Sequence, residues 1–301
     1  MLAISIIILT YNASRYLDAQ LKTLLNQGIK DSEIIIVDSS SSDNTLEIAK
    51  SYGVHALVIP KKEFDHGGTR TLAGKKAKGE FLIYLTQDAL PCDAFTIANL
   101  LQPLLNEKTI GAVFGRQLPY PDATPFAKHL RYFNYPEKSY IRSANDRRTH
   151  GVRTVFCSNS FAAYRRSALE DVGWFKQKLT LGEDMLACAK MLLKGYKLGY
   201  VAEATVYHSH NYSLADEFKR YFDIGVFHKM ENWILEEFGR PEGEGLRYSK
   251  SEISFLVANG LLHFLPLSII RSFLKFIGYR LGYHYDMLPD TLVKRLSMHA
   301  K

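Results

Sequence analysis

The first 115 residues alternate short runs of β-branched residues with helix-like stretches, and this alternation limits the available folds more than any other feature. The runs at 4–9 and 33–37 are apolar enough to be strands covered on both faces, as in a parallel sheet. Periodicity predicts the other elements of this part of the chain: strands at 54–59, 80–85 and 110–115, and helices at 13–26, 43–52, 69–78 and 93–105. The pattern predicts an α/β fold with a mostly parallel central sheet flanked by helices.

The remainder of the chain is less regular. Residues 116–154 are rich in Pro, Tyr and Arg and have no clean period, which predicts a functional loop or a poorly packed insertion. The elements predicted after it are a strand at 158–164, a short helix from Ser167, a helix from about 182, a strand pair at 198–206 and helices from Ser213 onward. We therefore expect one α/β domain over residues 1–210 and a helical C-terminal region over 211–301.

Composition and cysteine usage exclude several classes of protein. With 47% hydrophobic and 23% charged residues, the chain is too apolar to be disordered. The apolar opening run, Met1–Leu9, lacks the basic segment and cleavage site of a signal peptide, so we interpret it as a buried strand. Cys92, Cys157 and Cys188 are odd in number and far apart, which indicates a reducing compartment and predicts a cytoplasmic protein.

Polar side chains follow three of the predicted strands. Thr10-Tyr11-Asn12 follows the first strand, Asp38 opens a turn of small residues, and Thr86-Gln87-Asp88 follows a later strand. Ligands of parallel sheets bind at these strand ends. A single acid in such a place is most often a helix cap. Together, however, two acids suit a nucleotide that needs one carboxylate for its base or ribose and another for a metal on its diphosphate.

Two histidines and an acidic pair supply further candidates. His208 and His210, spaced by one residue at the end of a predicted strand, face the same side. Mg²⁺ or Mn²⁺ needs few protein ligands, so Asp88 and one of these histidines could hold it, although a structural histidine is the alternative. Glu183 and Asp184 open a helix, where acids are favoured with or without chemistry. An Asp there also suits a general base.

These motifs, in this order over residues 3 to 210, resemble the inverting glycosyltransferases of family 2, which have the GT-A fold. The resemblance implies a sugar-nucleotide donor and direct displacement at the anomeric carbon, with Asp184 as the catalytic base. It also implies that Asp38 contacts the nucleotide base or ribose and that Asp88 binds the metal. His208 would complete the metal site, with His210 as its competitor.

The chain departs from the family pattern at two positions. Thr86 stands where the usual Asp-x-Asp triplet has its first acid, and Ser39 stands where the turn after Asp38 has its second acid. Gln87 and Thr86 can offer only neutral oxygens. The departures weaken the expectation of a metal more than that of a nucleotide, and they leave a non-catalytic nucleotide-sugar-binding or scaffolding protein as the alternative to an enzyme.

The segment Phe64-Asp65-His66-Gly67-Gly68-Thr69-Arg70 narrows the resemblance to bacterial rhamnosyltransferases of O-antigen and related surface polysaccharides, which use dTDP-L-rhamnose. Gly67 would let the backbone approach the diphosphate, and Arg70 would reach a phosphate or the base. A glycine-rich turn with a solvated arginine is the alternative, as is another donor sugar. The residues expected on the donor side are Thr10, Tyr11, Asn12, Asp38, Phe64, His66, Gly67, Arg70, Gln87 and Asp88.

The net charge of +7 is concentrated in one segment. Residues 128–166 carry nine basic and two acidic side chains, and their net charge of +7 equals that of the whole chain. No nucleic-acid-binding motif accompanies them, so we expect no nucleic-acid partner. A solvated loop is one alternative. We favour a mobile loop whose Arg142, Arg147 and Arg148 meet a polyprenyl-diphosphate-linked glycan acceptor and anionic head groups, with Glu183 and Arg220 also on the acceptor side.

A basic, apolar stretch near the C-terminus fits a membrane surface. Residues 253–285 contain Arg271, Lys275 and Arg280, no acid, and many large apolar side chains. Such a segment can lie in a bilayer interface with its cations at the head groups, at the inner face of the cell membrane. The alternative is a helical hairpin that packs on the core or on a second copy of the chain as a homo-oligomer.

Overall fold

The computed structural model describes residues 3–29, 31–239 and 242–299. Within them, nine strands form one sheet in the order β3-β2-β1-β4-β8-β6-β9-β5, with β7 paired to β9. The strands are β1 (Ile4–Thr10), β2 (Ser32–Asp38), β3 (Ala56–Val58), β4 (Phe81–Thr86), β5 (Leu90–Pro91), β6 (Ile110–Leu118), β7 (Tyr140–Arg142), β8 (Phe161–Arg165) and β9 (Lys197–Tyr207). The expected α/β fold is confirmed. The strand pair expected at 198–206 is wrong, because β9 is one continuous strand.

The pairing of the strands brings the polar segments to one edge of the sheet. β1 runs parallel to β2 and β4, and Thr10 lies opposite Asp38. β6 and β9 are also parallel to each other, while β8 runs antiparallel between β4 and β6. Leu85 near the end of β4 therefore pairs with Phe161 at the start of β8. The ends of β1, β2, β4 and β9 and the beginning of β8 share this edge.

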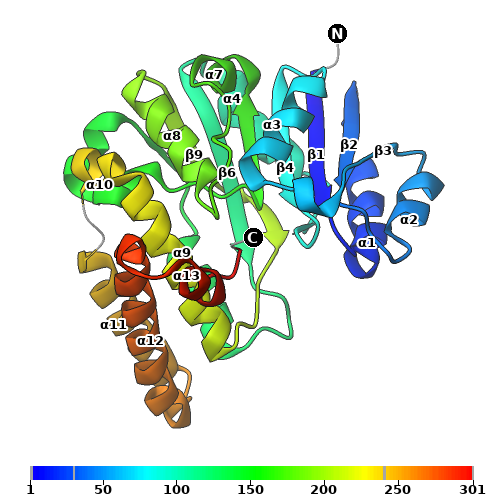
Figure 1. Cartoon of the computed structure of the whole chain (residues 1–301). Coiled ribbons are helices and arrows are strands. Elements are labelled where there is room, and N and C mark those ends of the chain that lie inside the picture. The colour runs from blue at the N-terminus through cyan, green and yellow to red at the C-terminus, as the bar shows by residue number, and fades with distance from the viewer. Residues whose placement is uncertain (1–2, 30, 240–241, 300–301) are drawn as a thin grey trace.

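Helices cover both faces of the sheet (Figure 1). Alternate residues of a strand point to opposite faces. Ile6 and Ile8 belong to the same core cluster as Leu17 of α1, whereas Ile7 belongs to the other cluster, with Ala73 of α3. The helices are α1 (Ser14–Leu25), α2 (Thr45–Ser51), α3 (His66–Lys76), α4 (Thr96–Asn106), α5 (Pro125–Asn134), α6 (Arg147–His150), α7 (Arg166–Asp171), α8 (Glu183–Leu193), α9 (Leu214–Met230), α10 (Asn232–Phe238), α11 (Glu242–Ala258), α12 (Leu265–Tyr283) and α13 (Asp290–Leu296).

The irregular segment at 116–154 is an ordered part of the structure. It contains the end of β6, α5, β7 and α6, with 3₁₀ turns at Ala144–Asp146 and Gly151–Val155. Phe126, Tyr135 and Val155 are buried, so the expected mobile loop or poorly packed insertion is wrong. Thr124 caps α5 by accepting a hydrogen bond from the Ala127 backbone N–H, and Pro125 follows at the first helical position. Those two residues are the sequence signal for this helix.

The C-terminal helices stand away from the sheet and are joined to it by α9 (Figure 1). α12 packs closely along α9. A Cβ atom at Gly282 would lie 1.9 Å from the carbonyl oxygen of Phe222, so only glycine allows this approach. The division of the chain into domains at residue 210 stays a prediction.

Two of the three cationic side chains of α12 are buried against neighbouring helices. Arg271 and Lys275 are buried and pair with Glu217 of α9 at 2.9 and 3.4 Å. The expectation that they lie at lipid head groups is therefore wrong, because acids of the neighbouring helices satisfy them; Arg280 alone of the three is exposed. No helix in the described part of the chain has both the length and the apolar character needed to cross a bilayer.

Candidate active site

Asp38 and Thr10 are buried at the end of the sheet, where their side chains are hydrogen-bonded to each other. The Asp38 side chain has 0% exposure and accepts hydrogen bonds from Thr10 Oγ1 at 2.8 Å and Ser41 Oγ at 2.6 Å. The backbone N–H of Ser41 donates to its other oxygen at 2.8 Å. The expectation that Asp38 and Thr10 contact a nucleotide directly is therefore wrong, because both side chains are buried and hydrogen-bonded to each other. They shape the turn instead.

Tyr11 and Asn12 are exposed at the same edge of the sheet, and Gln87 beside them is half-buried. Gln87 joins the β1 and β4 loops, because its Oε1 accepts from the Tyr11 N–H at 2.8 Å and its Nε2 donates to the Tyr11 carbonyl at 3.2 Å. Asn12 Oδ1 accepts from the Ser42 N–H at 2.9 Å. Gln87 thus has its oxygen already occupied, whereas Tyr11 is 38% exposed and can meet a ligand, with Lys61 Nζ 4.2 Å from the centre of its ring.

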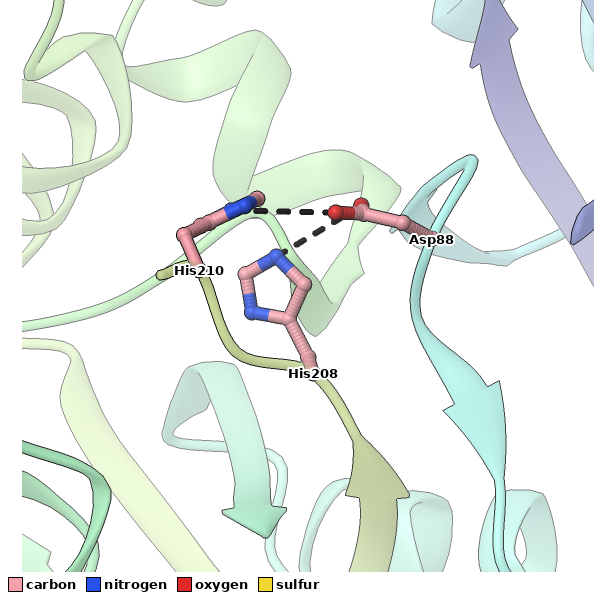
Figure 2. Close-up of side chains that lie close together, drawn as sticks. All are labelled: Asp88, His208 and His210. Carbon is pink, nitrogen blue, oxygen red and sulfur yellow. Dashed lines mark ion pairs between the residues drawn. The ribbon is translucent and has the colours of Figure 1, made fainter. Parts of the chain in front are cut away.

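Asp88, His208 and His210 converge at this edge (Figure 2). Asp88 follows β4, and both histidines follow β9. The Nε2 atoms of His208 and His210 lie 3.5 and 3.7 Å from the two carboxylate oxygens of Asp88. One ligand atom from each residue lies within 4.8 Å of the others. The structure therefore brings both histidines to Asp88, rather than one of them alone.

The electrostatics of this cluster suit a cation. Burial would raise the pKa of Asp88, but the neighbouring His208 and His210 hold it below its ordinary value. Burial, followed by the neighbouring His208, lowers the pKa of His210 to about 4. Burial also lowers the pKa of His208, with Asp88 opposing. An ionised carboxylate beside two neutral imidazoles is a donor set that divalent cations bind.

Asp184 and Glu183 begin α8 but occupy different surroundings. Gly182 precedes them in the left-handed region, at φ +84°. The Asp184 carboxylate accepts backbone hydrogen bonds from Asn159 at 3.0 Å and Met185 at 2.7 Å. Glu183 is buried and receives the Asn159 side-chain amide at 3.0 Å. Asn159, which precedes β8, is a residue that the sequence did not single out, and it fixes both acids.

Asp184 has the properties of a proton acceptor. Burial, and then the charge of Glu183, raises the pKa of Asp184 to about 6, while its hydrogen bonds from Asn159 and Met185 oppose the rise. A carboxylate with this pKa is ionised at neutral pH and still basic enough to take a proton. These properties suit the role of general base that the sequence predicts for Asp184.

The glycine-rich motif of α3 packs inward. Arg70 is 5% exposed and pairs with Glu183 at 2.9 Å, so it is neither solvated nor free to reach a phosphate. A Cβ atom at Gly67 would lie 1.9 Å from the Lys176 carbonyl oxygen. Gly67 therefore allows the backbone at Lys176 to come close, and the expectation that it lets a diphosphate approach is wrong. Glu183, which we expected on the acceptor side, is instead held in its ion pair with Arg70.

His66 lies beside a segment from the end of the described chain. Its ring contacts Phe64 and His299 edge-on, with centroids 4.9 and 5.5 Å apart. The backbone N–H groups of Met298 and His299 donate to the buried Asp223 of α9. Nothing in the sequence pattern signalled that His299 returns to the donor motif, more than 200 residues from His66 in sequence.

The arginines expected near an acceptor separate into two groups. Arg220 of α9 lies near the cluster, because its charge contributes to the lowered pKa values of His208 and His210. Arg142, by contrast, is opposite Leu198 at the start of β9, whereas His208 follows the end of that strand. Arg147 pairs with Glu237 at 2.9 Å, and Arg148 is exposed on the same short helix. The structure does not bring these three to the site.

Comparison with known proteins decides the family. The family model "Glycosyl transferase family 2" matches residues 5–173, and "Glycosyl transferase family group 2" matches residues 99–283. The chain belongs to glycosyltransferase family 2. It is 45% identical to the O-antigen chain rhamnosyltransferase WbaN of Salmonella anatum, over 98% of this chain and 94% of that protein. RfbN of Salmonella typhimurium, also named an O-antigen chain rhamnosyltransferase, is 45% identical over the same shares.

A solved structure supports the fold of this transferase. The mannosyltransferase PcManGT of Pyrobaculum calidifontis, in complex with GDP-Man and Mn²⁺, aligns with a TM-score of 0.65 at 17% identity. The alignment covers 94% of this chain and 87% of that one. The GT-A fold expected from the motifs is confirmed. The family and its rhamnosyltransferase relatives identify the chain as a glycosyltransferase, in preference to the non-catalytic binding protein left open by the sequence.

Proposed function

We propose that this enzyme transfers L-rhamnose from dTDP-L-rhamnose to a lipid-linked saccharide, with inversion at the anomeric carbon. The observation that carries the proposal is that one sheet edge holds both a cluster of residues that could bind a cation and a separate half-buried carboxylate with a raised pKa. The 45% identity to O-antigen chain rhamnosyltransferases supports rhamnose as the sugar. A different deoxysugar or a hexose is the competing donor.

Asp184 serves as the base in the proposed mechanism. An acceptor hydroxyl attacks the anomeric carbon from the face opposite the nucleotide, and its proton passes to the Asp184 carboxylate. The bond between the anomeric carbon and the phosphate oxygen breaks, and dTDP leaves with the electron pair of that bond. Asn159 and the Met185 N–H hold the carboxylate in place. Glu183 is kept ionised by Arg70 and contributes to the high pKa of the base.

Asp88, His208 and His210 would hold the divalent cation. Such a cation would neutralise the charge that develops on the departing diphosphate. Two imidazoles and one carboxylate favour Mn²⁺ over Mg²⁺, because Mg²⁺ prefers oxygen ligands. The absence of an acid at Thr86 is offset by the second histidine. Arg220, close to the cluster and without an acidic partner among the described residues, would meet a phosphate of the donor or acceptor.

The C-terminal helices would bring the enzyme to its acceptor. Ile269, Phe273 and Phe276 of α12 are 64%, 62% and 59% exposed, and Val257 of α11 is 51% exposed. Such an apolar face suits the head-group boundary of a bilayer, where a polyprenyl-diphosphate-linked glycan would be presented. We therefore propose peripheral attachment at the cytoplasmic face of the membrane. A homo-oligomer formed through this face is the competing interpretation.

A panel of sugar nucleotides tests the donor assignment. The purified enzyme with Mn²⁺ is offered dTDP-L-rhamnose, UDP-glucose, UDP-galactose and GDP-mannose, and release of nucleoside diphosphate is measured with and without membrane extract. We expect turnover with dTDP-L-rhamnose above all others. Turnover with another donor alone would refute rhamnose while leaving the transferase mechanism intact.

A further inference from the structure

Behind the cation cluster lies a second layer of buried polar side chains, formed by Gln117 and Arg131. Gln117 is the penultimate residue of β6, and Arg131 belongs to α5. Both are almost completely buried, at 1% and 8% exposure. Arg131 is one of the nine cations of the basic segment, yet it has no carboxylate partner among the described residues. A buried guanidinium without an acid needs another reason to be there.

The orientation of the Gln117 amide follows from donor and acceptor accounting. Arg131 Nη1 hydrogen-bonds the Gln117 side-chain atom that also lies 2.8 Å from His208 Nδ1. A guanidinium has only donors, so that atom must be the amide oxygen. The amide nitrogen then donates to Ser158 Oγ at 3.1 Å. Arg131 therefore fixes which end of Gln117 faces His208, and each polar atom of the amide has a partner.

The orientation of Gln117 sets the tautomer of His208. Because the Gln117 oxygen can only accept, the 2.8 Å contact requires His208 Nδ1 to carry the proton and donate it. Arg131 Nη1 also lies near Nδ1, at 3.5 Å, but its shorter bond goes to the same Gln117 oxygen. The lone pair of a neutral imidazole is then on Nε2, which faces Asp88 Oδ1 at 3.5 Å. Two acceptors facing each other repel, and 3.5 Å is longer than an ordinary hydrogen bond between them would be. A cation between the two atoms removes the conflict.

We infer that Gln117, locked by Arg131, is the positioning residue that holds His208 with its Nε2 lone pair directed at the cation site. The inference deepens the proposed function and rests on its metal site. His210 has no such hydrogen bond among the described residues: its ring lies tilted against that of Tyr212, with centroids 5.2 Å apart, and it is more exposed than His208. His208 is therefore the pre-organised ligand and His210 the adaptable one. Outer partners of this kind commonly change metal affinity by about 10- to 100-fold.

Two substitutions at residue 117 test this role. Gln117→Leu removes the acceptor, and Gln117→Glu keeps an oxygen facing both Arg131 and His208. Gln27→Leu is the matched control, because Gln27 is also a buried glutamine but bonds the Asp93 carbonyl and the Ile97 N–H instead. Mn²⁺ is titrated into each protein in the presence of dTDP, and free Mn²⁺ is followed by electron paramagnetic resonance.

We expect Gln117→Leu to raise the Kd for Mn²⁺ about 10- to 100-fold, while Gln117→Glu and Gln27→Leu bind like the wild type. An unchanged Kd in folded Gln117→Leu would overturn the inference. Two-bond ¹H–¹⁵N spectra of the metal-free wild type give a readout independent of activity and of the variants' folding. They should show His208 protonated on Nδ1, and a proton on Nε2 alone would also overturn the inference.

The metal site itself is tested separately. Wild-type protein that bound no Mn²⁺ would refute the proposed cation, yet the His208 spectrum would still test the role of Gln117. Conversely, loss of Mn²⁺ binding in Asp88→Ala together with an unaltered Kd in Gln117→Leu would keep the cation site and refute the positioning role.

Discussion

The sheet and helix α12 bury opposite kinds of side chain. Ile6, Ile7 and Ile8 of β1 have at most 1% exposure, and apolar residues of both flanking layers cover them. In α12 the buried face instead includes Ser268, Arg271 and Lys275. The apolar residues of α12 that would fill a core, Ile269, Ile270, Phe273 and Phe276, are exposed.

This difference corresponds to two different roles of the two regions. The sheet is held by apolar burial and can therefore present polar groups rigidly at one edge, where the chemistry occurs. The C-terminal helices are held to α9 by glycine contacts and ion pairs, such as Arg271 with Glu217, which leaves an apolar face available to something outside the chain. Substitutions should therefore separate chemistry, helix docking and surface attachment.

The largest effect is expected at the sheet edge. Asp184→Asn keeps the shape of the side chain but cannot accept a proton, so kcat for transfer should fall about 10²- to 10⁴-fold. Binding of dTDP, measured by calorimetry, should stay close to that of the wild type. Wild-type transfer by this variant would remove Asp184 from the role of base.

Removal of a buried cation from the C-terminal helices should cost stability rather than chemistry. Lys275 lies between Glu217 and Glu252, and Lys275→Met leaves both acids with one partner fewer. Breaking a buried pair from one side typically lowers the free energy of unfolding by about 3–5 kcal/mol. Urea unfolding measures this loss, with Lys250→Met, an exposed lysine of α11, as the control. A loss no larger than in that control would show that the ion network does not hold α12.

The exposed face of α12 should govern attachment alone. Phe273→Ser and Phe276→Ser should each weaken sedimentation with anionic phospholipid vesicles about tenfold, since a buried Phe side chain contributes about 1.5–3 kcal/mol. The free energy of unfolding should change little. Vesicle binding that persists in the double variant would refute the membrane interpretation, and a concentration-dependent dimer lost in the same variant would support a second copy as the partner.

The smallest effect concerns pH. The pKa of Asp184 is raised to about 6, so its carboxylate becomes protonated as the pH falls below this value and can no longer act as a base. The rate of transfer should therefore decrease about tenfold for each pH unit below about 6. Phe273→Ser, which changes an exposed side chain of α12, should show the same profile. A wild-type rate that stayed constant down to pH 5 would contradict the raised pKa.

Local sequence patterns were sufficient for most of the fold. Apolar runs such as 4–9 and 33–37 became β1 and β2, because a strand buried on both faces needs continuous apolar residues. Local patterns did not predict the elements of residues 116–154. Its helix α5 mixes cations with apolar residues, and one of these cations, Arg131, is itself buried.

The candidate site was only partly predictable for a related reason. The sequence placed Asp88, His208, His210 and Asp184 at strand or helix ends, and the fold brings the first three together. It could not show that Asp38 and Arg70 are withdrawn into internal bonds, since their pairing with Thr10 and Glu183 joins segments far apart in the chain. Gln117, Arg131 and Asn159 carried no local signal at all.

By itself, the sequence determined the alternation of strands and helices in the first 115 residues, the family and the polar residues at the strand ends, because these depend on periodicity and on contiguous motifs. The tertiary structure alone decided which charged groups remain available. A guanidinium or carboxylate is used up when a partner from a distant element reaches it, as Glu217 reaches Arg271. Arg220, near the histidines, has no acidic partner in the part of the chain that the structure describes and so stays available. That choice depends on three-dimensional proximity, which no local pattern encodes.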